Sequence, residues 1–164
     1  MRVEVIGVGY VGLVSGACFA EFGHHVHCVD KDPQRIAALR AGRMPIYEPH
    51  LDALVANNVA AGRLSFGTDL AEAVGDAEVV FIAVGTPARR GDGHADLAHV
   101  FACARDIAQA IRGYTVVVTK STVPVGTGDR VEHIMRLVQP QGAFAVVSNP
   151  EFLREGAAIA DFQQ

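Results

Sequence analysis

Apolar residues along this chain follow two alternating patterns. Short, nearly continuous apolar runs alternate with longer segments in which apolar residues recur every three or four positions. The first pattern is typical of strands buried on both faces, and the second is typical of helices with one buried face. Residues 79–84 are the clearest apolar run, and Val11, Val14, Cys18 and Phe22 are the clearest helical set. We expect this helical set, Phe22 included, to face a sheet.

Turn and capping residues give the element boundaries. Gly23 ends the first helix, Pro33 begins the second, and Thr68 is expected to cap the fourth. The expected strands are 3–6, 26–29, 64–66, 78–84, 115–119 and 144–147, and the expected helices are 11–22, 33–39, 50–60, 69–75, 97–111 and 128–137.

The regular alternation of strands and helices predicts a single-domain α/β fold. The expected architecture is a doubly wound parallel sheet of the Rossmann type, with strand order 3-2-1-4-5-6. Ligands of such sheets bind beyond the carboxyl ends of the strands. Residues that directly follow the strands are therefore the candidates for function.

The first strand is followed by a glycine-rich turn, Gly7-x-Gly9-x-x-Gly12. In this motif the first glycine permits a tight turn, the second lets the backbone approach a pyrophosphate, and the third lets helix and strand pack closely. Asp30 follows the second strand, 18 residues after the last glycine, where a carboxylate accepts hydrogen bonds from a ribose 2′-OH. Together these features predict a site for NAD.

The first twenty residues have an alternative interpretation as a secretory signal peptide, because Met1 and Arg2 precede a run of small and apolar residues. Glu4 and the glycine spacing disfavour this interpretation. No other stretch approaches the ~20 apolar residues of a membrane span. We expect a soluble, cytoplasmic protein without a membrane partner.

Composition narrows the choice of partners. Half of the 164 residues are hydrophobic and the net charge is −4, which disfavours a nucleic-acid partner. Cys18, Cys28 and Cys103 are widely spaced, and we expect them to be buried, reduced thiols. The seven histidines form no metal-binding motif, so no metal is expected.

Polar residues follow the last three strands as well, at 85–87, 120–124 and 149–155. Each segment has an ordinary explanation by itself: a turn after strand four, a helix cap at Thr122 after strand five, and a chain break after strand six. Their occurrence at consecutive strand ends indicates instead that they line one crevice.

Five strings of the chain resemble the N-terminal, NAD-binding domain of the UDP-glucose/GDP-mannose dehydrogenase family. The strings at 45–49 and 123–126 are more similar to the UDP-glucose branch than to the GDP-mannose branch. In chain order the five strings are 7–12, 45–49, 85–87, 120–127 and 149–156.

The resemblance implies an NAD-dependent oxidoreductase of polysaccharide biosynthesis. Members of the family oxidise the C6 alcohol of a nucleotide sugar to a carboxylate in two successive hydride transfers, through a thiohemiacetal and a thioester on a cysteine. For this chain the implied reaction is UDP-glucose to UDP-glucuronate, in an enzyme that is a homodimer when intact. GDP-mannose and UDP-N-acetylmannosamine remain alternative substrates.

The resemblance also implies roles for individual residues. Thr122 and Glu151 would be catalytic and would orient a proton or a water molecule, while Asp30 and Arg35 would hold the adenosine ribose. The sugar site would be lined by Glu151, Phe152, Leu153, Arg154 and Glu155. The cofactor would be contacted by Gly7, Gly9, Tyr10, Val11, Gly12, Asp30, Arg35, Gly85, Thr86, Pro87, Ser121, Thr122 and Glu155.

The chain departs from the family pattern because it has no counterpart of the nucleophilic cysteine motif or of the substrate-binding lysine and asparagine. We therefore expect residues 1–164 to be the NAD-binding domain, truncated before the central helix and the substrate domain, and to be inactive alone. Two other classes share the glycine turn: non-catalytic NAD-sensing modules and β-hydroxyacid dehydrogenases. Neither explains the strings at 120–127 and 149–156.

Overall fold

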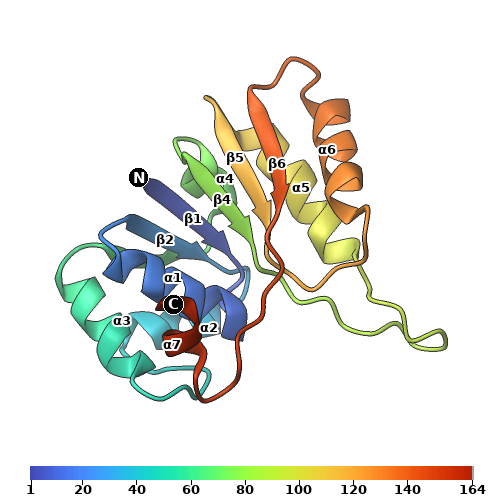
Figure 1. Ribbon diagram of the computed structural model, residues 1–164. Coiled ribbons are helices and arrows are strands. Elements are labelled where there is room, and N and C mark those ends of the chain that lie inside the picture. Colours follow the sequence, from blue (N-terminus) through green and yellow to red (C-terminus); the bar gives the residue numbers. More distant parts are fainter. Residues whose placement is uncertain (164) are drawn as a thin grey trace.

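The apolar runs form a six-stranded, all-parallel sheet in the computed structural model, which describes residues 1–163 (Figure 1). The strand order is β3-β2-β1-β4-β5-β6, so the predicted doubly wound topology is confirmed. The strands are β1 (Arg2–Ile6), β2 (His25–Val29), β3 (Leu64–Gly67), β4 (Val79–Ile82), β5 (Thr115–Thr119) and β6 (Phe144–Ser148).

Helices cover both faces of this sheet. Helices α1, α2, α3 and α7 pack around one apolar cluster, and α4, α5 and α6 pack around another. The sequence patterns predicted every helix except the short α7. The helices are α1 (Tyr10–Glu21), α2 (Pro33–Arg40), α3 (Leu51–Ala60), α4 (Leu70–Val74), α5 (Ala98–Ala110), α6 (Thr127–Val138) and α7 (Ala158–Gln163).

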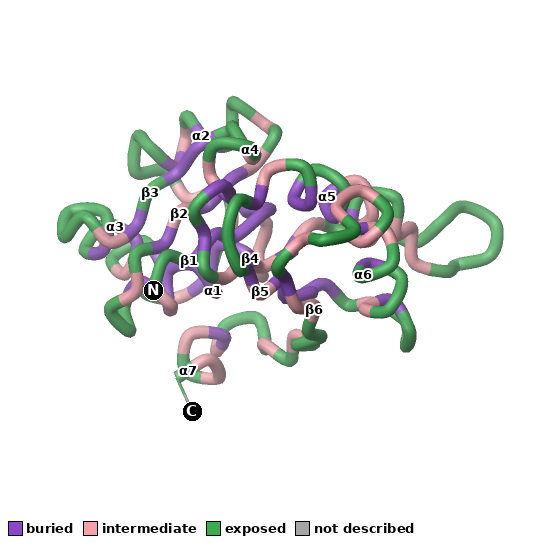
Figure 2. The backbone as a smooth tube through the Cα atoms, turned by 90° about the horizontal axis from the view of Figure 1, so that it is seen from above, coloured by how far each residue is buried: buried purple, intermediate pink, exposed green. Residues whose placement is uncertain are grey.

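The two clusters lie on opposite faces because successive strand residues point to opposite sides. In β1, Val3 and Val5 belong to the cluster that contains Leu13 of α1, whereas Ile6 belongs to the cluster that contains Ile107 of α5. Burial is concentrated in the strands and in the helix faces toward them (Figure 2). Both faces of the sheet are thus packed against helices, and the candidate functional residues lie in the loops at its carboxyl edge.

Two local predictions were wrong. Phe22 is 51% exposed, because it follows the last turn of α1 and lies beside the ring of Phe162 instead of the sheet, at a centroid distance of 6.2 Å. Thr68 does not cap α4: the carboxylate of Asp69 accepts the backbone N–H of Glu72 at 3.0 Å. A carboxylate at this position also interacts favourably with the positive end of the helix.

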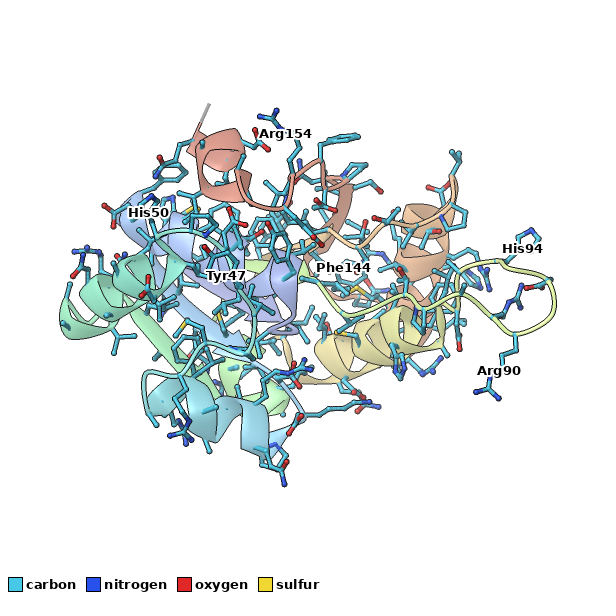
Figure 3. The ribbon with its side chains drawn as sticks, turned by 90° about the horizontal axis from the view of Figure 1, so that it is seen from below. Tyr47, His50, Arg90, His94, Phe144 and Arg154 are labelled. Atoms are coloured by element: carbon cyan, nitrogen blue, oxygen red, sulfur yellow. The ribbon has the colours of Figure 1, made fainter. Side chains whose placement is uncertain are left out.

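The three cysteines are free and buried, as expected. Burial raises the pKa of Cys18 to about 11 and that of Cys103 to about 12, so neither thiol forms the nucleophilic thiolate near neutral pH. Within residues 1–163, no helix is long and apolar enough to cross a lipid bilayer. Residues 88–96 form a loop that projects away from the sheet, with Arg90 and His94 near its tip (Figure 3).

Candidate functional site

The three glycines of the turn after β1 have three different environments. Gly7 has a φ of +98°, and a Cβ there would lie 2.7 Å from the carbonyl oxygen of Ala83. A Cβ on Gly12 would lie 1.8 Å from the carbonyl oxygen of Gly7. Apart from its neighbours in the chain, no heavy atom of residues 1–163 lies within 4 Å of a Cβ built on Gly9. The backbone of Gly9 is therefore open to an approaching ligand, as the motif predicts.

The amino end of α1 opens onto the same space. Gly9 is the N-cap residue and makes no side-chain cap, and the first turn of the helix contains no acidic residue. The first backbone N–H groups of a helix have no partner within it, and together with the helix dipole they favour an anion. This donor set fits the pyrophosphate of a dinucleotide.

Asp30 lies directly after β2 and contacts the glycine turn. One carboxylate oxygen accepts the backbone N–H of Val8 at 3.0 Å, and the other accepts the N–H of Asp32 at 2.9 Å. The guanidinium of Arg35 is 3.5 Å from the first oxygen, and the Asp30 side chain is only 12% exposed. The structure thus brings together Asp30, Arg35 and the glycine turn.

The ends of β4 and β5 are joined by two hydroxyl groups. Thr86 donates to the carbonyl oxygen of Thr122 at 3.2 Å, and Ser121 donates to the carbonyl oxygen of Val84 at 2.7 Å. Ser121 is buried, whereas Thr122 is exposed. Thr122 does not cap the next helix, because α6 begins after Gly126 without a side-chain cap.

The chain after β6 turns back across the sheet toward α1 (Figure 1). Lys120, buried at the end of β5, donates from Nζ to Asn149 Oδ1 at 2.9 Å and lies 5.5 Å from the ring centroid of Phe162. Burial lowers the pKa of Lys120, and the nearby carboxylate of Glu151 opposes this shift. A cavity of about 530 Å³ lies beside Lys120, between this segment and the sheet.

The predicted sugar-side residues lie in this returning segment. Glu151 is half-buried, and its carboxylate accepts the backbone N–H of Leu153 at 2.6 Å. Phe152 and Glu155 are exposed. Arg154 is exposed too, but its Nε lies 3.0 Å from a carboxylate oxygen of Asp161 (Figure 3). Thr122 and Glu151 therefore lie at the ends of neighbouring strands, on the same edge of the sheet as the glycine turn.

Glu48 is the main residue that the sequence did not single out. It is 5% exposed, and its carboxylate accepts the hydroxyl of Tyr10 and the backbone N–H groups of Gly156 and Ala158. It belongs to the string at 45–49, which suggested its importance only through resemblance. Two of its partners lie more than 100 residues further along the chain, so no local pattern reveals them.

Comparison with known proteins agrees with this geometry. The model of the UDP-glucose/GDP-mannose dehydrogenase family, NAD binding domain, matches residues 1–164. Over its whole length the chain is 66% identical to a UDP-glucose 6-dehydrogenase of Rhizobium meliloti, of which it covers 38%.

Two solved structures have nearly the same fold. A UDP-glucose dehydrogenase from Pyrobaculum islandicum superposes with a TM-score of 0.93 at 45% identity, over 98% of this chain and 38% of that one. A GDP-mannose dehydrogenase from Pseudomonas aeruginosa, solved as a ternary complex, superposes with a TM-score of 0.94 at 40% identity, over 99% of this chain and 38% of that one. The chain thus spans well under half the length of these relatives.

Proposed function

Because the chain belongs to the UDP-glucose/GDP-mannose dehydrogenase family as its NAD-binding domain, we propose that it is the cofactor-binding part of an enzyme that oxidises UDP-glucose to UDP-glucuronate. One observation carries the proposal. The open glycine turn with Asp30 lies on the same edge of the sheet as Thr122 and Glu151. The glycine turn and Asp30 form the first half of this edge, and Thr122 and Glu151 form the second half. A bound dinucleotide would therefore extend from the first half toward the second.

Each half of the edge has a separate task in this proposal. The backbone at Gly9 and the first N–H groups of α1 bind the pyrophosphate, and Asp30 with Arg35 holds the adenosine ribose. NAD, when bound, accepts the hydride from the C6 carbon of the sugar. Thr122 and Glu151 hold the water or the proton that the reaction requires. Residues 151–155 line the sugar.

UDP-glucose is favoured over the other nucleotide sugars because the more similar relatives are named for it. The Rhizobium meliloti UDP-glucose 6-dehydrogenase is 66% identical to this chain, whereas the GDP-mannose dehydrogenase is 40% identical. We also propose that the intact enzyme is a homodimer of the cytoplasm that serves polysaccharide biosynthesis. The buried, free thiols are compatible with a reducing compartment.

A domain exchange tests the proposal. This chain replaces the matching stretch of the Rhizobium meliloti enzyme, and NADH formation is measured with UDP-glucose and, as a control, with GDP-mannose. We expect two NADH per UDP-glucose and little activity with GDP-mannose. A folded chimera that binds NAD but does not oxidise UDP-glucose would contradict the proposed substrate. Calorimetry on the 164-residue chain, with NAD and with NADP, tests the cofactor separately.

A further inference from the structure

Glu48 contacts both halves of the proposed site, although it lies at neither a strand end nor a helix end. It is carried by the irregular segment between α2 and α3, where Figure 3 labels its neighbours Tyr47 and His50. Tyr47 and His50 are exposed, whereas Glu48 is buried. A buried carboxylate in an otherwise exposed segment needs partners that compensate for its lost hydration.

The partners of Glu48 come from both halves. One carboxylate oxygen accepts the hydroxyl of Tyr10 at 2.5 Å and the backbone N–H of Gly156 at 2.8 Å. The other accepts the N–H of Ala158 at 2.8 Å. Tyr10 is the first residue of α1, and Ala158 is the first residue of α7. Glu48 thus joins the glycine turn to the segment that follows β6, in addition to a longer contact of 3.5 Å from the Tyr10 hydroxyl to the carbonyl oxygen of Arg154.

These contacts favour the ionised carboxylate. Burial alone would raise the pKa of Glu48, but the hydrogen bonds from Tyr10 and from the backbone N–H groups of residues 156, 158 and 159 outweigh burial and lower this pKa. Hydrogen bonds to a charged acceptor are shorter and stronger than those between neutral groups. The bridge is therefore charged, and its strength depends on donors from both halves of the site.

We propose that Glu48 is a positioning residue that couples the two halves of the site, by holding Gly156 and Ala158 against Tyr10 of the glycine turn. The proposal rests on the function proposed above, because it takes residues 151–155 as the sugar-side segment. The backbone N–H of Tyr10 is one of the first N–H groups of α1, which have no partner within the helix. A ligand that fixes the amino end of α1 therefore also fixes the Tyr10 hydroxyl, which donates a hydrogen bond to Glu48. NAD bound at the turn then orders the segment that lines the sugar.

Hydrogen exchange of single amides in the 164-residue chain, followed by NMR with and without saturating NAD, tests the coupling. In the unmodified chain we expect NAD to slow exchange of the Gly156 and Ala158 amides at least fivefold. In Glu48→Gln this ratio falls close to one, because one carboxylate oxygen becomes an NH₂ group that cannot accept. In Tyr10→Phe it also falls close to one, although Glu48 still accepts both amides.

Asp161→Asn is the matched control. It weakens the contact between Asp161 and Arg154 within the same segment and removes no contact of Glu48, although the Arg154 carbonyl oxygen lies 3.5 Å from the Tyr10 hydroxyl. Exchange in this variant becomes faster overall, whereas the protection gained from NAD remains at least fivefold. If Asp161→Asn loses this protection as fully as Glu48→Gln does, general ordering of the segment replaces the proposed bridge, and the inference is wrong.

The remaining outcomes separate the two proposals. NAD that binds without slowing exchange of Gly156 and Ala158 in the unmodified chain overturns only the coupling. Unchanged NAD protection in Tyr10→Phe overturns the coupling too. Tyr10→Phe retains both backbone contacts of Glu48, so it still tests the coupling if Glu48→Gln does not fold. No NAD binding by the folded, unmodified chain overturns the proposed function and the coupling together.

Discussion

The two halves of the carboxyl edge are held in different ways. In the first half, Gly12 packs on Gly7, and the Asp30 carboxylate accepts the N–H groups of Val8 and Asp32, so most contacts join residues close in the sequence, although Gly7 also approaches Ala83. In the second half, the segment with Glu151 is held by Lys120 and Glu48, which come from other parts of the sequence. The half proposed to hold the cofactor is thus built mainly by contacts between residues close in the sequence, and the half proposed to hold the sugar is built by contacts between distant segments.

This difference predicts how substitutions act. A change in the first half alters backbone packing or the open space over the turn, and it affects folding and NAD binding. A change in the second half removes a chemical group or loosens the returning segment, and it affects turnover more than cofactor binding.

The glycine turn should show the largest effect. In Gly12→Ala the new methyl would overlap the carbonyl oxygen of Gly7 at 1.8 Å, so we expect a loss of at least about 3 kcal/mol in the free energy of unfolding. Gly9→Ala is the matched control because its methyl meets no protein atom within 4 Å. It should change stability by less than about 1 kcal/mol but weaken NAD binding about tenfold or more.

Thermal unfolding and calorimetry with NAD measure both variants. A stable Gly12→Ala domain with normal NAD affinity would mean that α1 can move away from β1 without disturbing the site. Normal NAD binding by Gly9→Ala would show that the cofactor does not approach the turn where its backbone is open.

Thr122→Ala and Glu151→Ala should give the next largest effect, in the chimeric enzyme described above. Both residues follow strands of the second half, and loss of a group that handles a proton or water lowers turnover about 10²-fold or more. NAD affinity should change much less. Steady-state kinetics and melting temperature are measured on the same proteins. Near-normal turnover with a lowered melting temperature would indicate that these residues only stabilise the fold.

Sequence patterns predicted the position of the glycine turn and of Asp30 in the first half of the edge because the signals for both lie within a short stretch of the chain. The glycine spacing indicates which backbone positions must be tight or open, and Asp30 directly follows an apolar strand. The sheet order follows equally from the alternation of short apolar runs with helical segments.

The second half could be predicted only in part. Lys120 and Glu48 lie in strings that revealed the family, but their partners Asn149 and Gly156 are 29 and 108 residues away. No periodicity encodes such a pairing. Helix α7 was missed because it has only six residues, too few for a clear helical pattern. It packs on α1 through a contact between Phe162 and Phe19, which are far apart in the sequence.

Asp30→Ala should weaken NAD binding by about 1.5–3 kcal/mol, because the ribose loses hydrogen bonds to a charged group. The preference for NAD over NADP should fall too, since the carboxylate no longer repels a 2′-phosphate. Asp32→Ala is the matched control. Asp32 caps α2 through the N–H groups of Gln34 and Arg35, so its loss costs about 1 kcal/mol of stability and leaves NAD affinity unchanged.

Titrations of both variants with NAD and NADP measure these effects. Equal binding of NAD and NADP by the unmodified domain would contradict the role given to Asp30. An equal loss of NAD affinity in Asp32→Ala would show that the whole β2–α2 connection, and not the Asp30 carboxylate, determines cofactor binding.

Glu4 is the exception to the well-organised first half. It lies in the middle of β1 beside His27 and Val80 in the sheet register, is 8% exposed, and has a carboxylate oxygen, Oε2, without a hydrogen-bond partner among the described residues. Burial raises its pKa from 4.5 to about 8. The unfolded chain therefore loses this proton at lower pH than the folded chain does, and Glu4 lowers stability progressively as the pH rises from about 4.5 to about 8.

Glu4→Gln tests this exception, because the amide resembles the protonated carboxyl in shape but does not ionise. We expect it to raise the free energy of unfolding at pH 8 by about 1–3 kcal/mol. Near pH 4.5 it should have little effect, because the folded chain is protonated at Glu4 and the unfolded chain has only begun to lose this proton. Urea unfolding at both pH values measures this, with the exposed Glu132→Gln as a control that should change stability by less than about 0.5 kcal/mol. An equal gain at both pH values would assign the effect to packing. No gain at pH 8 would mean that β1 accommodates the ionised carboxylate of Glu4. The first half of the edge would then tolerate a charge within the strand beneath it as well as the charge of Asp30 at the strand end.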